Sequence, residues 1–488
     1  MKLIFEYGSL NKKGYRLPPL DVERVNIEEY ISGEYGKYLR KELNIKAVSE
    51  IDIVRHYTNL SHKNYSVDTN FFPLGSCTMK YNPRINEKLA SINILTDVHP
   101  LCPEEFIQGS LAIMYELKEL LKELGGFDEV CLHPAAGAHG ELTGLLMISA
   151  YHKDKGNFHK RKVLIPDTAH GTNPASASLC KFEVVPVRSN ERGQIDMDDF
   201  MKKLDDETAC LMITNPNTLG IFEENIKEIA EELHKRDALL YMDGANFNAL
   251  VGLFQPGKWG VDVMHFNLHK TFSTPHGGGG PGSGPLGISK KLIPFLPVPQ
   301  VKRKGDKYIL NWDIPKSIGK IISFYGHYNV FIKALAYILY HGKDLKKVAE
   351  FSVLNARTLR KLLRGVFKDP YENIPCLHEF VLSATNLIKY GVKAMDVAKR
   401  LLDYGFYAPT VYFPLTVREA LMIEPTETES LENIKNFAET LKNIVKEIKR
   451  NPDIVKKAPH RTPVRRIKEA EANRKLILSY KDILLNQQ

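Results

Sequence analysis

Short apolar runs alternate with longer amphipathic stretches through the middle of the chain. The apolar runs are rich in β-branched residues, as is typical of buried strands. The stretches between them, such as 223–235, have the spacing of helices with one apolar face. Strands that alternate with helices form βαβ units, so this pattern predicts an α/β fold with a mainly parallel sheet covered on both faces. The predicted strands are 129–133, 162–165, 183–187, 209–213, 238–242 and 261–266.

The N-terminal part of the chain has a different pattern. It is irregular and interrupted by prolines up to about residue 110. Within it, 55–61 and 72–80 place polar side chains in segments that resemble turns and not a periodic face. Such a segment could carry function or wrap a neighbouring subunit. We expect an extended N-terminal segment over residues 1–110.

Helices dominate beyond residue 325. Residues 330–340 are apolar nearly all round, which predicts a buried helix, and 430–449 predict an amphipathic one. Two short runs, 379–382 and 420–423, fit strands of a small α+β domain. We therefore predict a large domain over 111–324 and a smaller C-terminal domain over 325–488.

Composition limits the class of protein. The 488 residues suffice for two or more domains, and the net charge of +9 is too mild for a nucleic-acid-binding surface, although it could attract an acidic protein. The six cysteines form no CxxC pair, which suits a reducing compartment. The sequence has neither a secretory signal pattern nor an apolar run long enough to cross a bilayer. We expect a cytoplasmic protein that binds neither nucleic acid nor membrane.

Lys270 is the first candidate for chemistry. It follows the predicted strand 261–266 and precedes a glycine-rich loop at 277–284. A lysine at the end of a buried strand is a candidate Schiff-base amine, because burial favours its neutral, nucleophilic form. The alternative is an ordinary solvated surface charge.

Asp243 follows another predicted strand, 238–242. A carboxylate in an apolar setting needs a cation, and a protonated pyridine nitrogen would serve. Pyridoxal phosphate sites pair a Schiff-base lysine with such an acidic partner. A structural ion pair or a metal ligand remains the alternative for Asp243.

The segment from Gly137 through Ala138 to His139 lies between a predicted strand and a predicted helix. Small residues at a helix N-terminus leave backbone N–H groups open to a phosphate. The other possibility is a tight connection without a ligand.

Polar residues also follow other predicted strands. His170 comes just after strand 162–165, where an imidazole could lie flat on a cofactor ring or move protons, or could simply be structural. Asn215 follows strand 209–213 and offers an amide to a cofactor or substrate, with turn formation as the alternative. Thr172, Asn246 and His269 adjoin these positions and complete the set of candidate cofactor ligands.

Three other motifs are set aside. Residues 282–287 fit GxGxxG, but no convincing helix follows them, so a dinucleotide site is not expected. The HGGG run at 276–279 lacks a GxSxG nucleophile elbow elsewhere in the chain. His265 and His269 are four residues apart, but the glutamate of HExxH is missing between them. We therefore predict no metal site.

Six segments along the chain stand out as a group. They are PLGSCTMKYNP (73–83), AHGTNPASA (169–177), MDGANFNAL (242–250), NLHKTFSTPHGGGGPGSGPLG (267–287), ALMIEPTETES (420–430) and APHRTPVRR (458–466). Together they resemble the glycine decarboxylase P-protein family of the glycine cleavage system, and the likeness runs nearly end to end. Within that family, the chain resembles subunit 2 of the two-subunit form, which holds the cofactor lysine.

The resemblance implies a fold-type-I enzyme that depends on pyridoxal 5'-phosphate. Lys270 would form the Schiff base with the cofactor, Asp243 would pair with its pyridine nitrogen, and His170 would stack on its ring. The segment 137–139 would hold the phosphate. Cys77, Thr78 and Lys80 are assigned to the mouth of the active site, where substrate enters.

The implied reaction is the decarboxylation of glycine, with transfer of the remaining aminomethyl group to the lipoyl arm of the H-protein. The resemblance also implies subunit 1 as a partner, in an α2β2 assembly. Another fold-type-I amino-acid decarboxylase or an aminotransferase is the main alternative. A noncatalytic scaffold subunit is a third reading, and the presence of Lys270 argues against it.

Overall fold

The structure, a computed structural model, describes residues 2–8, 14, 18–26, 29, 31, 33–40, 46–479 and 482. The chain divides into two compact units, Met1–Ser66 and Val67–Gln488. Each unit is described by itself below.

The first unit contains the short 3₁₀ helices η1 (Ile4–Glu6) and η2 (Gly33–Tyr38) and the α-helix α2 (Glu50–Ser61). The expectation of turn structure over 55–61 is wrong, because these residues form the second half of α2. The helix begins after Ser49, whose Oγ accepts from the backbone N–H of Asp52, and two acidic residues in the first turn favour the helix dipole. The remainder of the prediction for 1–66 lies partly outside the described residues.

The second unit is built on a seven-stranded sheet with the order β1-β7-β6-β5-β4-β2-β3. All of its strands run parallel except β7, which is antiparallel to both of its neighbours. The prediction of a mainly parallel sheet is therefore confirmed, and the six predicted strands are all present. The strands are β1 (Glu129–Cys131), β2 (Lys162–Pro166), β3 (Glu183–Val187), β4 (Thr208–Thr214), β5 (Leu239–Gly244), β6 (Val263–Phe266) and β7 (Leu286–Ile288).

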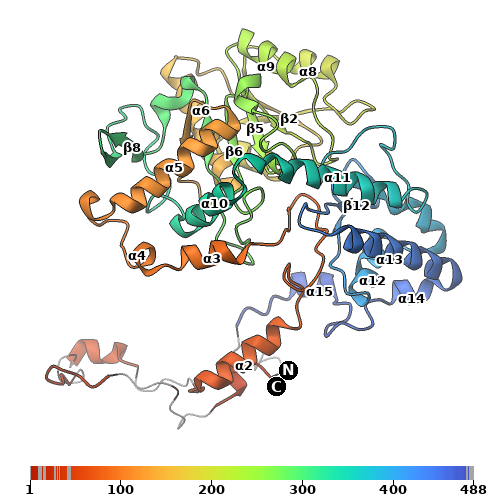
Figure 1. Ribbon diagram of the computed structural model, residues 1–488, viewed down its shortest axis with the longest axis horizontal. Helices are drawn as coiled ribbons and strands as arrows, with labels where there is room; N and C mark the ends of the chain where they lie inside the picture. The colour runs from red at the N-terminus through yellow and green to blue at the C-terminus, as the bar shows by residue number, and fades with distance from the viewer. Residues whose placement is uncertain are drawn as a thin grey trace. The chain divides into compact units, whose positions relative to one another are not determined.

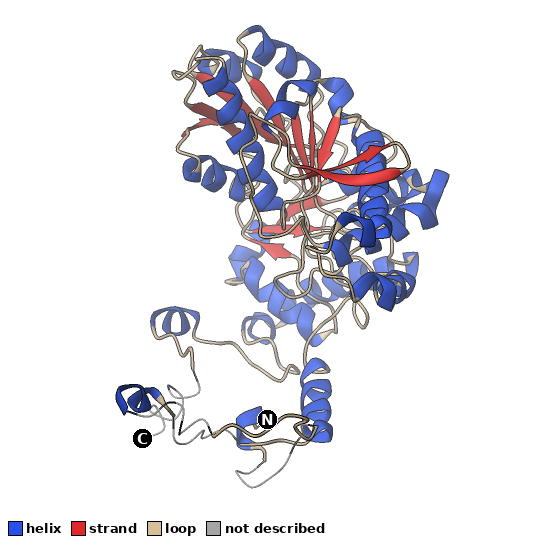
Figure 2. Ribbon diagram, turned by 90° about the vertical axis from the view of Figure 1, so that its left-hand side faces the viewer, coloured by secondary structure: helices blue, strands red, loops and turns tan. Residues whose placement is uncertain are grey.

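Helices cover both faces of this sheet (Figure 2). One face packs against α5 (Gln108–Gly125), α8 (Met197–Lys203), α9 (Ile226–Lys235) and α10 (Tyr328–His341), and the other against α6 (Gly137–Asp154) and α7 (Thr172–Leu179). The central strands β4 and β5 are buried along their whole length, as expected of strands covered on both sides. A two-stranded hairpin, β8 (Gln300–Lys304) and β9 (Lys307–Asn311), packs beside α5.

One prediction for this region needs correction. Residues 330–340 form a helix, but they are not buried all round, since Leu339 is 64% and Tyr340 is 76% exposed. Helix α10 packs against α5 and α3 (Arg84–Ala90), so its opposite side at the C-terminal end faces solvent. An apolar composition does not by itself bury a helix on all sides, because each side also needs a neighbouring element to pack against.

The C-terminal part has its own three-stranded antiparallel sheet and a second hydrophobic core. The sheet order is β10-β12-β11, and α12, α13 and α14 gather beside it (Figure 1). The first core takes in residues up to Ala349, whereas Ala356 and residues up to Val455 belong to the second. Elements of this part are α11 (Lys346–Leu362), β10 (Phe380–Ser383), α12 (Ala394–Asp403), β11 (Thr410–Val411), β12 (Ala420–Ile423), α13 (Leu431–Arg450), α14 (Pro452–Lys456) and α15 (Glu469–Arg474).

The segment before α3 joins this smaller sheet. Leu74 forms an isolated bridge with Ile423 of β12, and Phe71 packs in the second core. A Cβ on Gly75 would lie 2.3 Å from Met422 Cγ, so this close approach of the two backbones requires glycine. Residues 71–80 are thereby fixed between the two sheets. None of the helices in the described part of the chain has the length and apolar character of a membrane span.

Candidate active site

The predicted site residues gather where the parallel strands end. Asp243 lies at the end of β5 and His170 follows β2, while Lys270 comes four residues after β6. The backbone N–H of His170 donates to Thr214 Oγ1 at the end of β4, at 3.0 Å. In an α/β sheet, the carboxyl ends of the strands are where ligands bind.

Asp243 is a buried carboxylate with three hydrogen-bond donors. Its Oδ1 receives His265 Nε2 at 2.9 Å and the backbone N–H of Ala245 at 2.9 Å, and its Oδ2 receives Asn173 Nδ2 at 3.1 Å. Burial alone would raise the pKa of Asp243, but contact with His265 and the nearby His170 lower this pKa below its ordinary value. The carboxylate is therefore ionised at neutral pH, as a partner for a protonated ring nitrogen must be.

His265 connects Asp243 to a deeper group. Its Nδ1 shares a hydrogen bond of 2.8 Å with the hydroxyl of Tyr241, which is fully buried and has a pKa raised by that burial. Sequence analysis considered His265 only as a zinc ligand and missed this role. The available signal was its place on strand β6, directly opposite Asp243 in the parallel register.

His170 and Thr172 are linked to each other and to a buried acid. His170 Nδ1 lies 2.9 Å from Thr172 Oγ1, which donates to Glu141 Oε1 at 2.6 Å. Burial lowers the pKa of His170, and the charges of Asp243 and Lys270 act on it in opposite directions. This pKa favours a neutral imidazole, a form that can stack on an aromatic ring.

Helix α6 begins with free backbone donors. Ala136 at its N-cap position makes no side-chain hydrogen bond, so the N–H groups at the start of the helix are open to an anion. Ala138 is exposed, and a Cβ on Gly137 would lie 2.5 Å from Asn267 Oδ1. His139 is occupied on one side, because its Nδ1 accepts from the backbone N–H of Ala135 at 3.1 Å. Gly137 and Ala138 are the residues that fit a phosphate best.

Two predicted amides are buried and only partly bonded. Asn215 Oδ1 accepts from the N–H of Glu223, while its Nδ2 has no partner among the described residues. Asn246 Nδ2 donates to Pro216 O and Glu379 Oε1, while its Oδ1 is likewise unpaired within the described chain. Buried polar atoms without a partner are unfavourable, so both side chains have capacity for a ligand.

Lys270 and His269 begin the loop after β6. Lys270 Nζ donates to the carbonyl of Ser76 at 2.7 Å. Burial lowers the pKa of His269 to about 3, so its imidazole is neutral at neutral pH, and its Nδ1 accepts from the N–H of Ser283. The glycines at 277–280 that follow all have positive φ, which favours glycine over other residues.

The three residues predicted at the mouth have different surroundings. Cys77 is half-buried, and burial raises the pKa of its thiol to about 11 despite the opposing charge of Lys270. Thr78 is buried and donates from both its N–H and its hydroxyl to Glu424. The charge of Lys270 acts on the Cys77 thiol and on Glu424, the acceptor of Thr78.

Lys80 lies deeper in the protein. It is 2% exposed, and its Nζ contacts Glu427 Oε1 at 2.6 Å, Thr271 O at 2.8 Å, Asn248 Oδ1 at 2.9 Å and Tyr337 Oη at 3.2 Å. With its ammonium surrounded in this way, Lys80 ties the 71–80 segment to the loop after β6, to α10 and to Glu427, and it does not reach an open surface.

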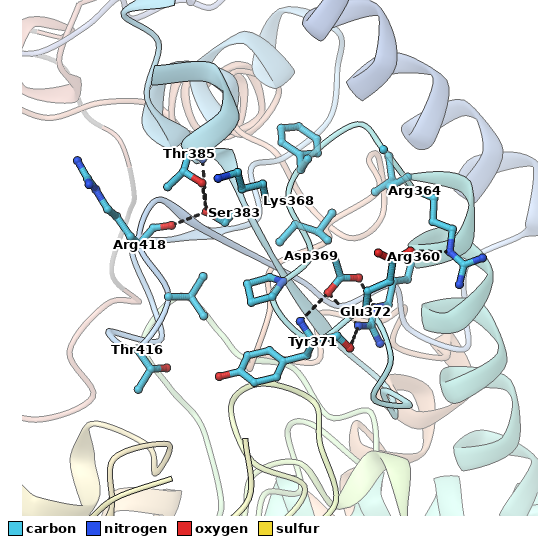
Figure 3. Close-up of a pocket in the computed structure, with 16 residues that line it drawn as sticks. Arg360, Arg364, Lys368, Asp369, Tyr371, Glu372, Ser383, Thr385, Thr416 and Arg418 are labelled. Atoms are coloured by element: carbon cyan, nitrogen blue, oxygen red, sulfur yellow. Dashed lines mark hydrogen bonds and ion pairs between the residues drawn. The ribbon is translucent and has the colours of Figure 1, made fainter. Parts of the chain in front are cut away.

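A separate pocket of about 600 Å³ lies in the C-terminal part (Figure 3). Arg360 lies against it and binds Asp369 through two hydrogen bonds of 2.7 and 2.9 Å. The residues that line it belong to segments 360–385 and 416–418. They include none of the predicted site residues, so this pocket is distinct from the site at the strand ends.

Together, these residues fit pyridoxal phosphate. A lysine amine, an ionised acid, a neutral imidazole, an uncapped helix N-terminus and two underbonded amides meet at one edge of the sheet. The groups match the amine, ring nitrogen, ring face and phosphate contacts that this cofactor requires.

Comparisons with known proteins agree with this interpretation. Residues 348–464 match the family described as Glycine dehydrogenase, C-terminal domain, and 145–281 match Aminotransferase class-V. The chain is 70% identical over 483 residues to the probable glycine dehydrogenase (decarboxylating) subunit 2 of Aquifex aeolicus, which covers 99% of this chain and 100% of that protein. A protein of the same name from Caldanaerobacter subterraneus is 54% identical over 479 residues, 98% of both chains.

A solved structure is similar over most of the chain. It is a crystal structure of glycine decarboxylase (P-protein) in inhibitor-bound form, with a TM-score of 0.74 and 20% identity, and the match covers 86% of this chain and 95% of that chain. With the Aminotransferase class-V match, this likeness confirms the fold-type-I architecture.

Proposed function

Because the chain belongs to the family of glycine dehydrogenase (decarboxylating) subunit 2, we propose that it is a pyridoxal phosphate enzyme that decarboxylates glycine. The remaining aminomethyl group passes to the lipoyl arm of the H-protein, the carrier of the glycine cleavage system. The observation that carries this proposal is the 70% identity over nearly the whole chain, in a protein whose strand ends bring together the groups this chemistry needs.

Each of the site residues has a separate role in holding the cofactor. Lys270 would supply the amine that binds it, and Gly137 and Ala138 would hold its phosphate through the N–H groups of α6. His170 would contact the ring. Asp243 would hold a proton on the ring nitrogen, because its carboxylate is ionised and fixed by three donors. When bound, the cofactor would supply an electron sink.

The remaining predicted ligands surround the ring. Thr172 positions His170 through the hydrogen bond between their side chains, and Asn215 and Asn246 have unused hydrogen-bonding atoms for the cofactor or for glycine. His269, whose imidazole is neutral, directly precedes Lys270 and would adjoin the cofactor. Cys77, which is half-buried, lines the side from which glycine and the lipoyl arm enter, whereas Thr78 is buried against Glu424.

The family name implies a second chain, so we propose subunit 1 as a partner in an α2β2 assembly. The H-protein would dock on a surface complementary in charge to this chain, whose net charge is +9. The reaction would take place in the cytoplasm. Raised salt should weaken the binding of H-protein and leave cofactor absorbance unchanged, because exposed charges are screened. Affinity that does not respond to salt would contradict this part of the proposal.

The test compares the parent chain with Lys270→Ala, each combined with subunit 1. The parent should show the visible absorbance of a lysine-bound cofactor and should exchange labelled carbon dioxide with glycine only when H-protein is added. Lys270→Ala should lose both. Exchange in the parent without H-protein would indicate another decarboxylase, and absence of the visible absorbance in the parent would refute a catalytic role.

A further inference from the structure

The turn at 76–78 has an unusual backbone. Ser76 and Thr78 have φ angles of 64° and 49°, in the left-handed region that residues with a Cβ rarely adopt. A β-branched residue such as Thr78 is especially unfavourable there. Such a conformation persists only when the surrounding structure holds it in place.

Two buried glutamates hold this turn. Glu379 Oε2 receives the backbone N–H of Ser76 at 2.6 Å. Glu424 Oε2 receives the N–H of Thr78 at 2.9 Å, and its Oε1 receives the Thr78 hydroxyl at 2.6 Å. Both glutamates come from the smaller sheet, immediately before β10 and immediately after β12, and both are at most 1% exposed. The turn therefore depends on acceptors from the C-terminal domain.

The two carboxyl groups lie close together, and His378 Nε2 is 3.9 Å from Oε1 of each. Glu379, Glu424 and His378 each present a ligand-type atom within 4.8 Å of the others. Burial lowers the pKa of His378 to about 3, so His378 brings no positive charge at neutral pH. Lys270 is a cation that acts on both carboxyls, and its charge lowers the pKa of each against the larger effect of burial. The two carboxyl groups are therefore linked to Lys270 in two ways. The charge of Lys270 acts on them directly, and they bind the turn whose carbonyl accepts from the Lys270 amine.

The Ser76–Thr78 turn connects the two glutamates to Lys270. Its ammonium donates to the carbonyl of Ser76 at 2.7 Å, and the N–H of the same residue is bound by Glu379. Because Ser76 and Thr78 are both held by hydrogen bonds, the orientation of the Ser76 carbonyl is fixed. An amine held in one position reacts faster than one that must search for its geometry.

We propose that Glu379 and Glu424 are positioning residues for Lys270, which clamp the Ser76–Thr78 turn and so hold its carbonyl where it receives the Lys270 amine whenever that amine is not bonded to the cofactor. This inference rests on the proposed function, in which Lys270 is the cofactor lysine. It assigns to the C-terminal domain a part in presenting the amine, although the lysine itself belongs to the large domain.

The test measures how fast cofactor-free protein captures pyridoxal phosphate. Visible absorbance gives the rate, and borohydride trapping followed by peptide mass mapping identifies Lys270 as the site. Glu424→Gln keeps the shape of the side chain and removes its charge, and should slow capture about tenfold, the factor expected for loss of a hydrogen bond to a charged group. The matched control is Glu429→Gln. Glu429 lies on the same segment but accepts from Asn433 and not from the turn, so this variant should capture cofactor at the parent rate.

A second pair of variants covers the case in which Glu424→Gln does not fold, as judged by circular dichroism. Thr78→Val removes the hydroxyl bond to Glu424 and keeps the branched shape, whereas Thr78→Ser keeps the hydroxyl. Capture slowed in the valine variant and restored in the serine variant supports the clamp. Equal rates in these two variants, or a parent rate in folded Glu424→Gln, overturn it. If the parent itself captures no cofactor at Lys270, the proposed function fails instead.

Discussion

Replacing His265 by leucine should destabilise the protein by about 3 kcal/mol. That figure lies between the contribution of a hydrogen bond to a charged group, about 1.5–3 kcal/mol, and the penalty for breaking a buried pair by removing one partner, about 3–5 kcal/mol. The lower part of the range is favoured because Asp243 keeps two donors, Asn173 Nδ2 and the N–H of Ala245. His265→Gln, which can place an amide donor near the same carboxylate, should recover part of the loss.

The assay is guanidinium denaturation of the cofactor-free chain at several pH values. Asp243 has a depressed pKa in the folded state, so its contribution is present above the ordinary carboxyl pKa and is lost as pH falls toward the folded value. The difference between parent and His265→Leu should therefore be largest at neutral pH and should shrink below about pH 4. Equal denaturation midpoints for the two proteins at pH 7, or a difference that grows on acidification, would refute this reasoning.

Three further outcomes are expected from the packing and the charges. Gly144→Ala should destabilise by about 1–3 kcal/mol in denaturant, because its Cβ would lie 2.6 Å from Tyr241 Cε2; Gly109→Ala, where nothing lies within 4 Å, should not. Lys80→Met should cost about 3 kcal/mol in the same assay, since it leaves the half-buried carboxylate of Glu427 without its cation. Burial raises the pKa of Glu424 to about 7, so stability should fall by up to about 3 kcal/mol as pH rises from 4 to 8, and Glu424→Gln should reduce that slope, leaving the part that comes from Glu379, whose pKa burial also raises.

The strand pattern made much of this fold predictable. The apolar runs before Asp243 and Lys270 are buried on both faces, so their composition alone indicated strands of a covered parallel sheet. Once the strands are in parallel register, residues that follow them must meet at one edge. The helix after Gly137 was also predictable from local pattern, because small residues there separate a strand from an amphipathic stretch.

Other features had no such local signal. Strand β7 has three residues and runs against its neighbours, so no βαβ period marks it. Helix α2 is largely exposed, and only the Ser49 cap indicates where it begins. The acceptors Glu379 and Glu424 adjoin apolar strands of the smaller sheet, and they lie 303 and 346 residues from the backbone groups that they bind. Sequence spacing holds no information on contacts of that range.

The placement of the 71–80 segment has a consequence for how the protein matures. The carbonyl of Ser76 accepts from Lys270, and the backbone N–H groups of Ser76 and Thr78 donate to Glu379 and Glu424. The segment can therefore be fixed only when Lys270, Glu379 and Glu424 are all present. During synthesis, the lysine therefore emerges from the ribosome well before the groups that orient it. A nascent chain that ends ahead of β12 can complete the seven-stranded sheet, yet its amine would have no fixed direction until the residues that follow β12 have been made.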